Sequence, residues 1–207
     1  MPIGRLHVIT DARPGRDPIA VVRAALSAGT PVIQVRAPSA SGRELYDLAV
    51  RVLHLCQAHG AQCLVDDRPD VALAVGAAGA HLGADDLPLA ATRRMVGPAF
   101  ILGATARGPD EARARVADGA SYLGVGPAFA TATKSGLPEP IGVATLAQVV
   151  EAVTVPVIAI GGVSAERVPE LLAAGVHGVA VVSQVSDAAD PAAAVRALLR
   201  ALGQVAA

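Results

Sequence analysis

One pattern repeats eight times along this chain: a short run of Val, Ile and Leu, then a longer stretch in which apolar residues recur with helical spacing. The short runs lie at 6–10, 30–36, 61–67, 80–83, 99–105, 121–126, 155–162 and 176–183. The longer stretches follow at 17–29, 41–60, 68–79, 87–97, 108–119, 143–153, 164–175 and 190–203. Glycine closes most of the longer stretches, as it commonly closes helices. The pattern predicts eight β-strands, each followed by an α-helix.

The predicted strands are nearly continuous apolar runs, which is typical of parallel strands that are buried on both faces. Eight strand-helix units with no remainder favour an α/β fold of the (β/α)8 TIM-barrel type, with residues 1–207 as a single domain. A chain of 207 residues is long enough for such a barrel. The alternative is an open doubly wound sheet. It is disfavoured because no GxGxxG segment follows the first strand.

Charge and composition argue against large partners. The formal net charge is -1, aromatic residues make up 2 % of the chain, and like charges form no block. We therefore expect no nucleic-acid and no membrane partner, although homo-oligomer formation stays open. No signal-like N-terminus and no apolar run of about 18 residues is present, so a cytoplasmic protein is expected. Cys56 and Cys63 fit neither a CxxC motif nor a disulfide framework and are expected to be buried free thiols.

The connection after the sixth predicted strand, at 126–142, is the longest one without structure of its own. It contains Lys134, the only lysine among 17 basic residues. Long loops inside compact domains are often functional. We expect this loop to hold an anion.

Polar residues gather where the predicted strands end, which in a barrel is the catalytic face. They are Thr10, Asp11, Gln34, Arg36, Asp66, Asp67, Arg68, Asp85, Asp86, Thr105, Arg107, Thr131, Thr133, Lys134, Gly161, Gly162 and Ser183.

These residues divide by chemistry into carboxylates, cationic or hydroxyl donors, and glycines. Asp67 and Asp86 are hard oxygen ligands of the kind that Mg²⁺ accepts. Arg36 and the segment Thr131, Thr133 and Lys134 supply donors suited to a diphosphate. Together the two sets indicate a metal-diphosphate site.

The glycine pair Gly161-Gly162 precedes a helix predicted to start at Ser164. Bare backbone amides at a helix N-terminus can bind a phosphate, so a second anion site is indicated.

Simpler interpretations exist for each of these groups. The aspartates at 66–67 and 85–86 could merely cap the helices that follow them. The glycine pair could serve turn geometry alone. His81 lies in an apolar strand and is more typical of a hydrogen-bonded core histidine than of a catalyst.

Four segments together resemble thiamine phosphate synthase and its sister, thiazole tautomerase. They are QVR at 34–36, DDRPDVALAVGAAGAHLGADD at 66–86, GVGPAFATATK at 124–134 and IAIGGV at 158–163. The resemblance implies a transferase that joins hydroxymethylpyrimidine diphosphate to thiazole phosphate, giving thiamine phosphate and diphosphate, with Mg²⁺ as cofactor. These two small molecules would be its partners in a cytoplasmic reaction of thiamine biosynthesis.

The resemblance also implies roles for individual residues. Asp67 and Asp86 would ligate Mg²⁺. Catalytic roles would fall to Arg36, Lys134 and Thr105. Substrate contacts would fall to Gln34, Asp66, Thr131, Thr133, Gly161, Gly162, Val182 and Ser183, with Gln34 and Arg36 on the diphosphate and the last four on the thiazole phosphate.

The chain departs from the synthase pattern at several positions. Pro38 stands where that pattern has a second basic residue, Asp66 where it has Asn, Ala84 where it has Gln, and Arg107 where it has His. One lost cation and one added carboxylate predict weaker diphosphate binding unless Arg107 or Arg68 compensates. Two alternatives therefore stay open: a tautomerase acting on thiazole carboxylate phosphate, although its catalytic histidine is replaced by Pro127, and a silent barrel that binds thiamine precursors.

Overall fold

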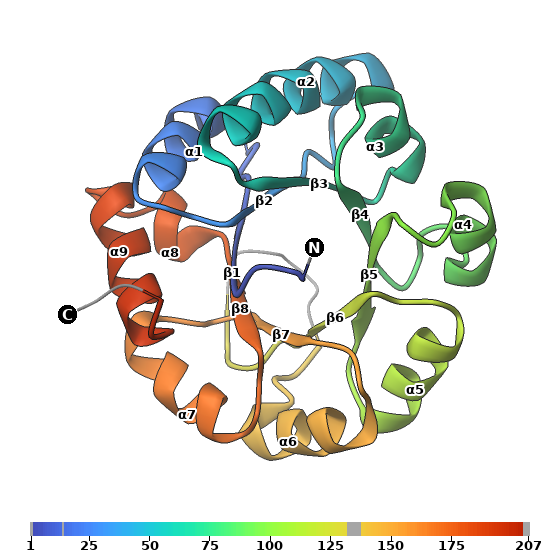
Figure 1. The fold of residues 1–207 in the computed structure, drawn as a ribbon. Helices are drawn as coiled ribbons and strands as arrows, with labels where there is room; N and C mark the ends of the chain where they lie inside the picture. Colours follow the sequence, from blue (N-terminus) through green and yellow to red (C-terminus); the bar gives the residue numbers. More distant parts are fainter. Residues whose placement is uncertain (1, 14, 132–137, 205–207) are drawn as a thin grey trace.

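Eight parallel strands form a closed barrel in chain order, in a computed structural model that describes residues 2–13, 15–131 and 138–204. The strands are β1 Leu6–Ile9, β2 Val32–Val35, β3 Gln62–Asp66, β4 Gly79–Leu82, β5 Ile101–Ala106, β6 Tyr122–Val125, β7 Val157–Ile160 and β8 Gly178–Val181. Figure 1 looks along this barrel and shows the strands as an inner ring inside a ring of helices. The predicted (β/α)8 barrel is confirmed.

The outer ring consists of the helices that the sequence predicts, with two additions. Its members are α1 Pro18–Ser27, α2 Gly42–His59, α3 Pro69–Val75, α4 Leu89–Val96, α5 Pro109–Ala117, α6 Gly142–Ala152, α7 Val168–Ala173 and α9 Pro191–Ala201. The additions are a 3-10 turn η1, Ala165–Arg167, before α7, and a short helix α8, Ser183–Ser186, directly after β8. Both additions lie at the carboxyl ends of strands.

Local capping explains where several helices begin and end. Asp17 accepts hydrogen bonds from two backbone N–H groups at the start of α1. Ser41 and Glu44 form a reciprocal capping box at the start of α2. Gly60 ends α2 with φ +66°, a left-handed conformation that glycine adopts at no steric cost.

Two hydrophobic layers form the core. The larger one lies between the strands and the helices, and it includes Cys56 and Cys63, which are free and buried as predicted. The smaller one fills the barrel itself and is built around Leu64, Tyr122 and Ile158. The inside of the barrel is therefore a packed core and not a channel.

The amino end of the barrel is closed by the N-terminal segment. Ile3 packs into the inner core, and Figure 1 shows this segment crossing the ring of strands. Arg5 donates from Nε to the carbonyl of His177 at 2.7 Å and from Nη1 to that of Leu202 at 2.8 Å. The opposite end, where the strands terminate, is left to hold the candidate site.

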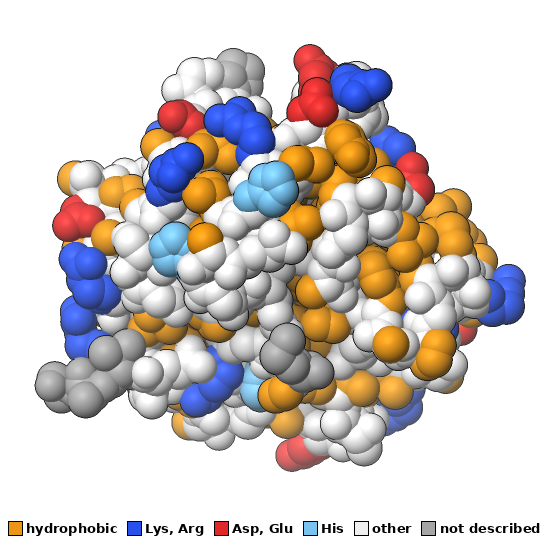
Figure 2. Space-filling view, turned by 45° about the horizontal axis from the view of Figure 1, so that its top comes forward, with side chains coloured by type: hydrophobic (Ala, Val, Ile, Leu, Met, Phe, Trp, Pro, Cys, Tyr) orange, Lys and Arg blue, Asp and Glu red, His pale blue; other side chains and the backbone are white. Residues whose placement is uncertain are grey.

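The surface carries charges of both signs. On the face drawn in Figure 2, basic and acidic side chains are interspersed among apolar and neutral ones, with no block of one sign. None of the described helices combines the length and the apolar character needed to cross a membrane.

Candidate active site

The closed parallel barrel brings the carboxyl ends of all its strands to one rim. Residues that follow or end different strands meet there, as the sequence analysis expected: Arg36 after β2, Asp66 and Asp67 at β3, Asp86 after β4, Thr105 in β5, Gly161 and Gly162 after β7, and Val182 and Ser183 after β8. Thr131, in the β6–α6 connection, is also described. Thr133 and Lys134 lie outside the described residues.

Asp67 has φ +66° and is the one non-glycine residue among those described with a positive φ. Its N–H donates to the carbonyl of His81 at 2.9 Å. The N–H of Arg68 donates to the carbonyl of Asp66 at 2.8 Å, which closes a three-residue turn around Asp67. A backbone of this kind costs about 1 to 3 kcal/mol and is concentrated at functional sites.

The simple capping interpretation of the aspartates does not hold. The residue that caps α3 is Arg68, and the one that caps α4 is Pro88, and neither helix has a side-chain cap. Asp86 instead accepts a hydrogen bond at Oδ2 from the N–H of Gly83, at 2.7 Å, within the β4–α4 connection. The positions of Asp67 and Asp86 therefore call for another explanation.

The carboxylates at this corner fit a hard divalent cation. Oδ1 of Asp66 is buried without a hydrogen-bond partner, and burial, followed by the negative charge of Asp67, raises the pKa of Asp66 well above its usual value. A nearby cation would relieve this excess of negative charge. Within the described part of the chain no three His, Cys, Asp or Glu side chains are grouped closely enough to hold a metal by themselves. Two carboxylates, completed by water and substrate phosphate, are nevertheless a common protein contribution to Mg²⁺ binding.

Three arginines near this corner have different partners. Nε of Arg36 lies 3.8 Å from Oδ2 of Asp67. Arg68 points to the helix surface, where its guanidinium pairs with Asp70 at 2.6 Å and 2.8 Å. Arg107 donates from Nη2 to the carbonyl of Glu139 at 2.7 Å, while its Nε is buried without a partner. Arg68 is therefore paired with a carboxylate at the surface, whereas Arg107 has no carboxylate among these side-chain partners and keeps a buried N–H without a partner.

Gln34 lies inside the barrel, two residues before Arg36 in the chain, and is only 3 % exposed. Its amide nitrogen is 2.8 Å from Nδ1 of His7 and donates to the hydroxyl of Tyr122 at 3.0 Å. Nε2 of His7 is in turn 3.0 Å from the carbonyl of Gly4. Both amide hydrogens of Gln34 are thus engaged within the barrel, so in this arrangement no N–H of Gln34 is left for the diphosphate, and the predicted contact stays a prediction.

The same hydrogen-bonded series continues upward to the rim. The hydroxyl of Tyr122 is 3.1 Å from Nδ1 of His81, and Nε2 of His81 is 3.1 Å from Oγ1 of Thr105. Burial lowers the pKa of His81 to about 4, with the positive charge of Arg36 as the second cause. His81 is therefore a partly buried histidine whose two ring nitrogens both have hydrogen-bond partners inside the protein, in line with its sequence context.

The glycine pair after β7 is packed tightly against the loop after β6. Gly161 has φ +93° and Gly162 φ +64°. The N–H of Phe129 donates to the carbonyl of Gly161 at 3.0 Å. A Cβ atom on Gly161 would lie 2.6 Å from Cβ of Pro127, and one on Gly162 would lie 2.5 Å from the carbonyl oxygen of Ala130. Glycine is therefore required here both for its conformation and for the close approach of the loop.

Helix α8 completes this part of the rim. Val182 is its N-cap residue and Ser183 its first residue. In many barrels a phosphate binds between the loops after strands seven and eight and the N-terminus of a short extra helix. The arrangement of Gly161, Gly162, Val182 and Ser183 corresponds to that description.

The far end of α8 is fastened to the loop after β1. Ser186 donates from Oγ to Oδ2 of Asp11 at 3.0 Å, and Arg13 donates from Nε to Oδ1 of Asp11 at 2.8 Å. The Asp11 side chain is 3 % exposed. Hydrogen bonds from Arg13 are the main cause that lowers the pKa of Asp11 to about 2, against the opposing effect of burial. Asp11 is therefore a buried anchor for α8.

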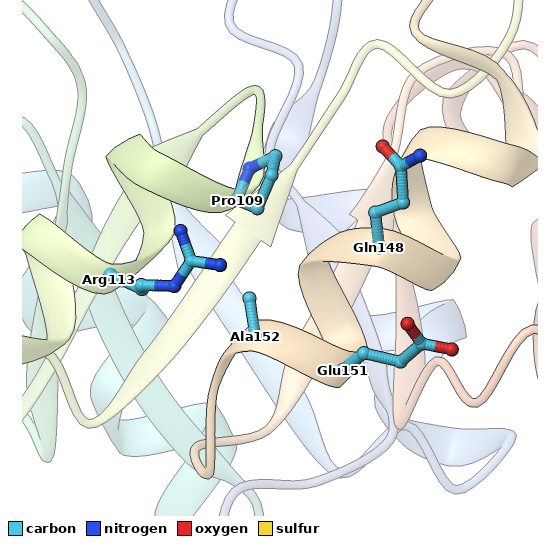
Figure 3. Close-up of a pocket in the computed structure, with 5 residues that line it drawn as sticks. All are labelled: Pro109, Arg113, Gln148, Glu151 and Ala152. Atoms are coloured by element: carbon cyan, nitrogen blue, oxygen red, sulfur yellow. The ribbon is translucent and has the colours of Figure 1, made fainter.

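Among the hollows that the described residues form are the following two. One, of about 200 Å³, is lined by the β6–α6 connection and includes Thr131, Phe129 and Glu139. The other, of about 380 Å³, lies between α5 and α6 and is lined by Pro109, Arg113, Gln148, Glu151 and Ala152, as Figure 3 shows. Only the first contains a predicted site residue.

Sequence reasoning missed several residues that shape the rim. Arg167 stacks its guanidinium 4.1 Å from the centre of the Phe129 ring and donates to the carbonyl of Gly162 at 3.1 Å. Ser186 was not singled out, although Asp11 was noted at a strand end. The sequence pattern predicts Tyr122 correctly within a strand but does not reveal the two hydrogen-bond partners of its hydroxyl. Only the pairing of distant segments identifies these contacts, and no local motif signals them.

Comparison with known proteins gives a consistent result. The family described as thiamine monophosphate synthase matches residues 6–185. The chain is 59 % identical over 203 residues to the thiamine-phosphate synthase of Salinispora arenicola, covering 97 % of this chain and 98 % of that one. It is 44 % identical to the thiamine-phosphate synthase of Chloroflexus aurantiacus, covering 97 % and 93 %. A solved structure of thiamine phosphate pyrophosphorylase from Pyrococcus furiosus superposes with a TM-score of 0.89 at 37 % identity, covering 98 % and 97 %.

Proposed function

Because the chain belongs to the thiamine monophosphate synthase family and is a transferase with thiamine-phosphate synthase activity, we propose that the rim divides the reaction between two corners. The corner at β2–β5 takes the pyrimidine diphosphate, and the corner at β7–β8 takes the thiazole phosphate. The observation that carries this division is the position of Asp67. Its backbone has a positive φ, its side chain lies beside Arg36, and its strand β3 neighbours β4, the strand that leads to Asp86.

The first corner serves departure of the diphosphate. The bond between the pyrimidine methylene carbon and the diphosphate oxygen breaks, and its electron pair leaves with the diphosphate. Mg²⁺ bound by Asp67 and Asp86 would supply positive charge to that leaving group. Arg36 donates hydrogen bonds to the diphosphate, and the guanidinium of Arg107, whose buried Nε has no partner, offers a further positive charge in place of the cation missing at Pro38.

The second corner positions the nucleophile. The backbone amides of Gly161 and Gly162, with Val182 and Ser183 at the start of α8, hold the thiazole phosphate. This leaves the thiazole nitrogen to form the new carbon–nitrogen bond with the methylene carbon. Holding both reactants on one rigid rim lowers the entropic cost of their encounter.

The β6–α6 connection joins the two corners. Thr131, Thr133 and Lys134 close over the diphosphate in this proposal, and Lys134 follows it as it departs. A mobile ammonium group suits that task better than the planar guanidinium of arginine. Asp66 and Gln34 contact the pyrimidine substrate from below. A cytoplasmic location and a homo-oligomeric state remain expectations.

The test is an assay of the purified chain with hydroxymethylpyrimidine diphosphate and thiazole phosphate, with and without Mg²⁺, read by the fluorescence of oxidised thiamine phosphate. Product should require Mg²⁺ and disappear in Asp67→Ala. The matched control is Asp85→Ala, which removes a neighbouring exposed carboxylate and should retain activity. Undiminished product from Asp67→Ala would refute the metal assignment, and no product from the unaltered chain would refute the proposed reaction.

A further inference from the structure

Five side chains from five strands form a continuous hydrogen-bonded series through the barrel. It runs from His7 on β1 through Gln34 on β2, Tyr122 on β6 and His81 on β4 to Thr105 on β5. The donor–acceptor separations along the series lie between 2.8 and 3.1 Å. Of these residues the reaction proposed above uses only Gln34, and the family resemblance implies a role for Thr105.

The hydrogen bonds at the His7 end of the series have a fixed donor–acceptor direction. The carbonyl of Gly4 can only accept, so Nε2 of His7 must carry a hydrogen and donate to it at 3.0 Å. Complete burial lowers the pKa of His7 to about 3, so the ring is neutral and its Nδ1 is an acceptor. The partner of that Nδ1 must then be the amide nitrogen of Gln34. The reversed amide would direct its oxygen at a lone pair and is excluded.

Each following bond takes its direction from the one before. The second amide hydrogen of Gln34 goes to the Tyr122 hydroxyl, which thereby becomes an acceptor and must place its own hydrogen on Nδ1 of His81. Because Nδ1 of His81 accepts this hydrogen, the ring hydrogen of His81 lies on Nε2 and is donated to Oγ1 of Thr105. The hydroxyl hydrogen of Thr105 is then free to be donated to a ligand at the rim.

The consequence is a defined hydrogen-bonding polarity at Gln34 and at Thr105, the two residues of the series that the proposal places against the substrate. Both N–H hydrogens of Gln34 are donated within the barrel, so Gln34 can offer a substrate only its carbonyl oxygen, which is an acceptor. Thr105 offers a donor. A 4-aminopyrimidine ring displays the complementary pair, because its amino group donates and its ring nitrogens accept. A 4-oxopyrimidine displays the reverse pair.

We propose that Tyr122, His7 and His81 are positioning residues that make Gln34 an acceptor and Thr105 a donor. In this way they select the 4-aminopyrimidine form of the diphosphate substrate. This inference rests on the proposed function of the rim. It assigns a specificity role to residues inside the barrel that touch no substrate. Sites that pair buried polar groups with a ligand discriminate strongly, because the wrong ligand leaves those groups unpaired.

The direct test compares binding of hydroxymethylpyrimidine diphosphate with that of its 4-oxo analogue, by calorimetry with Mg²⁺ and without thiazole phosphate. The unaltered chain should bind the amino form at least about 100-fold more tightly. Tyr122→Phe frees His81 to adopt either tautomer and should reduce that ratio to about tenfold or less. Tyr46→Phe, which removes the hydroxyl of the other tyrosine on the outer helix α2, should keep the full ratio. A full ratio in folded Tyr122→Phe would overturn the proposal.

A second measurement needs no variant at the core. In ¹⁵N-histidine NMR spectra of the unaltered chain at pH 7, His7 and His81 should both be neutral with hydrogen on Nε2. Hydrogen on Nδ1 of His81 would overturn the inference even if thiamine phosphate is formed. Conversely, discrimination between the two pyrimidines without turnover would overturn the proposed reaction and support this inference.

If Tyr122→Phe does not fold, two substitutions of Thr105, together with the NMR result, test the proposal. Thr105→Ser keeps the hydroxyl and should keep the binding ratio. Thr105→Val keeps the shape without the hydroxyl and should lower the ratio at least tenfold. Equal ratios in the two variants would contradict the donor role of Thr105 and with it the proposal.

Discussion

Nε of Arg36 lies 3.8 Å from Oδ2 of Asp67, where the neighbouring strands β2 and β3 end. The two side chains are 30 % and 35 % exposed, so both remain accessible to a ligand from solvent. A cation and a carboxylate held side by side can bind the two components of a metal-diphosphate complex. They cannot satisfy each other fully at this distance.

The strained backbone at Asp67 predicts a conflict between stability and activity. Asp67→Gly should abolish product formation, because it removes a proposed Mg²⁺ ligand. It should leave the free energy of unfolding unchanged or raise it by about 1 kcal/mol, since glycine relieves the positive φ but adds flexibility to the unfolded chain. Urea unfolding and the fluorescence assay measure the two effects. The control is Asp85→Gly, at a position without positive φ, which should retain activity. A large loss of stability in Asp67→Gly would contradict the strain argument.

The different partners of Arg107 and Arg68 predict different effects of removing them. Arg107→Ala should raise the KM for the pyrimidine diphosphate about tenfold or more, because a charge-assisted hydrogen bond contributes about 1.5 to 3 kcal/mol. Arg68→Ala should change that KM less than about twofold, since exposed pairs such as Arg68–Asp70 contribute little. The KM for thiazole phosphate serves as the internal reference. Equal effects of the two substitutions would remove the compensating role from Arg107.

Lys134, although outside the described residues, can be tested by kinetics. Lys134→Ala should reduce turnover more than it reduces binding of thiazole phosphate, because the proposed role is to accompany the leaving group. Lys134→Arg keeps the charge but not the compact, mobile ammonium, so it should restore turnover only in part. Steady-state turnover and calorimetric binding of thiazole phosphate separate the two effects. Unchanged turnover in Lys134→Ala would show that the lysine does not serve the diphosphate.

The Asp11 anchor predicts a specific acid sensitivity. The pKa of Asp11 is lowered to about 2 from the ordinary 3.8, so its stabilising contribution is complete above about pH 4 and is lost as the pH falls toward 2. The contribution at neutral pH should be at most about 2 kcal/mol, and added salt should weaken it, because the Arg13 partner is 46 % exposed.

Unfolding of Asp11→Asn and of the unaltered chain between pH 2 and 6 tests this. The difference in unfolding free energy should be largest at pH 6 and vanish near pH 2. Asp118→Asn, on the exposed surface after α5, is the matched control and should show no such trend. A difference between Asp11→Asn and the unaltered chain that persists at pH 2 would exclude the charge as its cause.

Much of this molecule follows from local pattern. The apolar runs and helical stretches predicted all eight strands and the eight main helices, because burial on both faces and helical periodicity leave their mark within each segment. Because all strands of a parallel barrel end at one rim, predicting the barrel also placed Asp67, Asp86 and Gly161 on that rim. No individual contact between them had to be known. The sequence did not reveal α8, because four residues are too few to show a helical period.

The amino-acid sequence alone therefore determined the barrel, the rim and the chemical types of residue on it. Only the tertiary structure decided which partner each polar group takes: Asp70 for Arg68, the Glu139 carbonyl for Arg107, Ser186 for Asp11, and Tyr122 for Gln34. The physical reason is that hydrogen bonds and ion pairs act over a few ångströms between segments that lie far apart in the chain. Periodicity records whether a residue is buried, but it carries no information about which strand delivers the neighbouring atom.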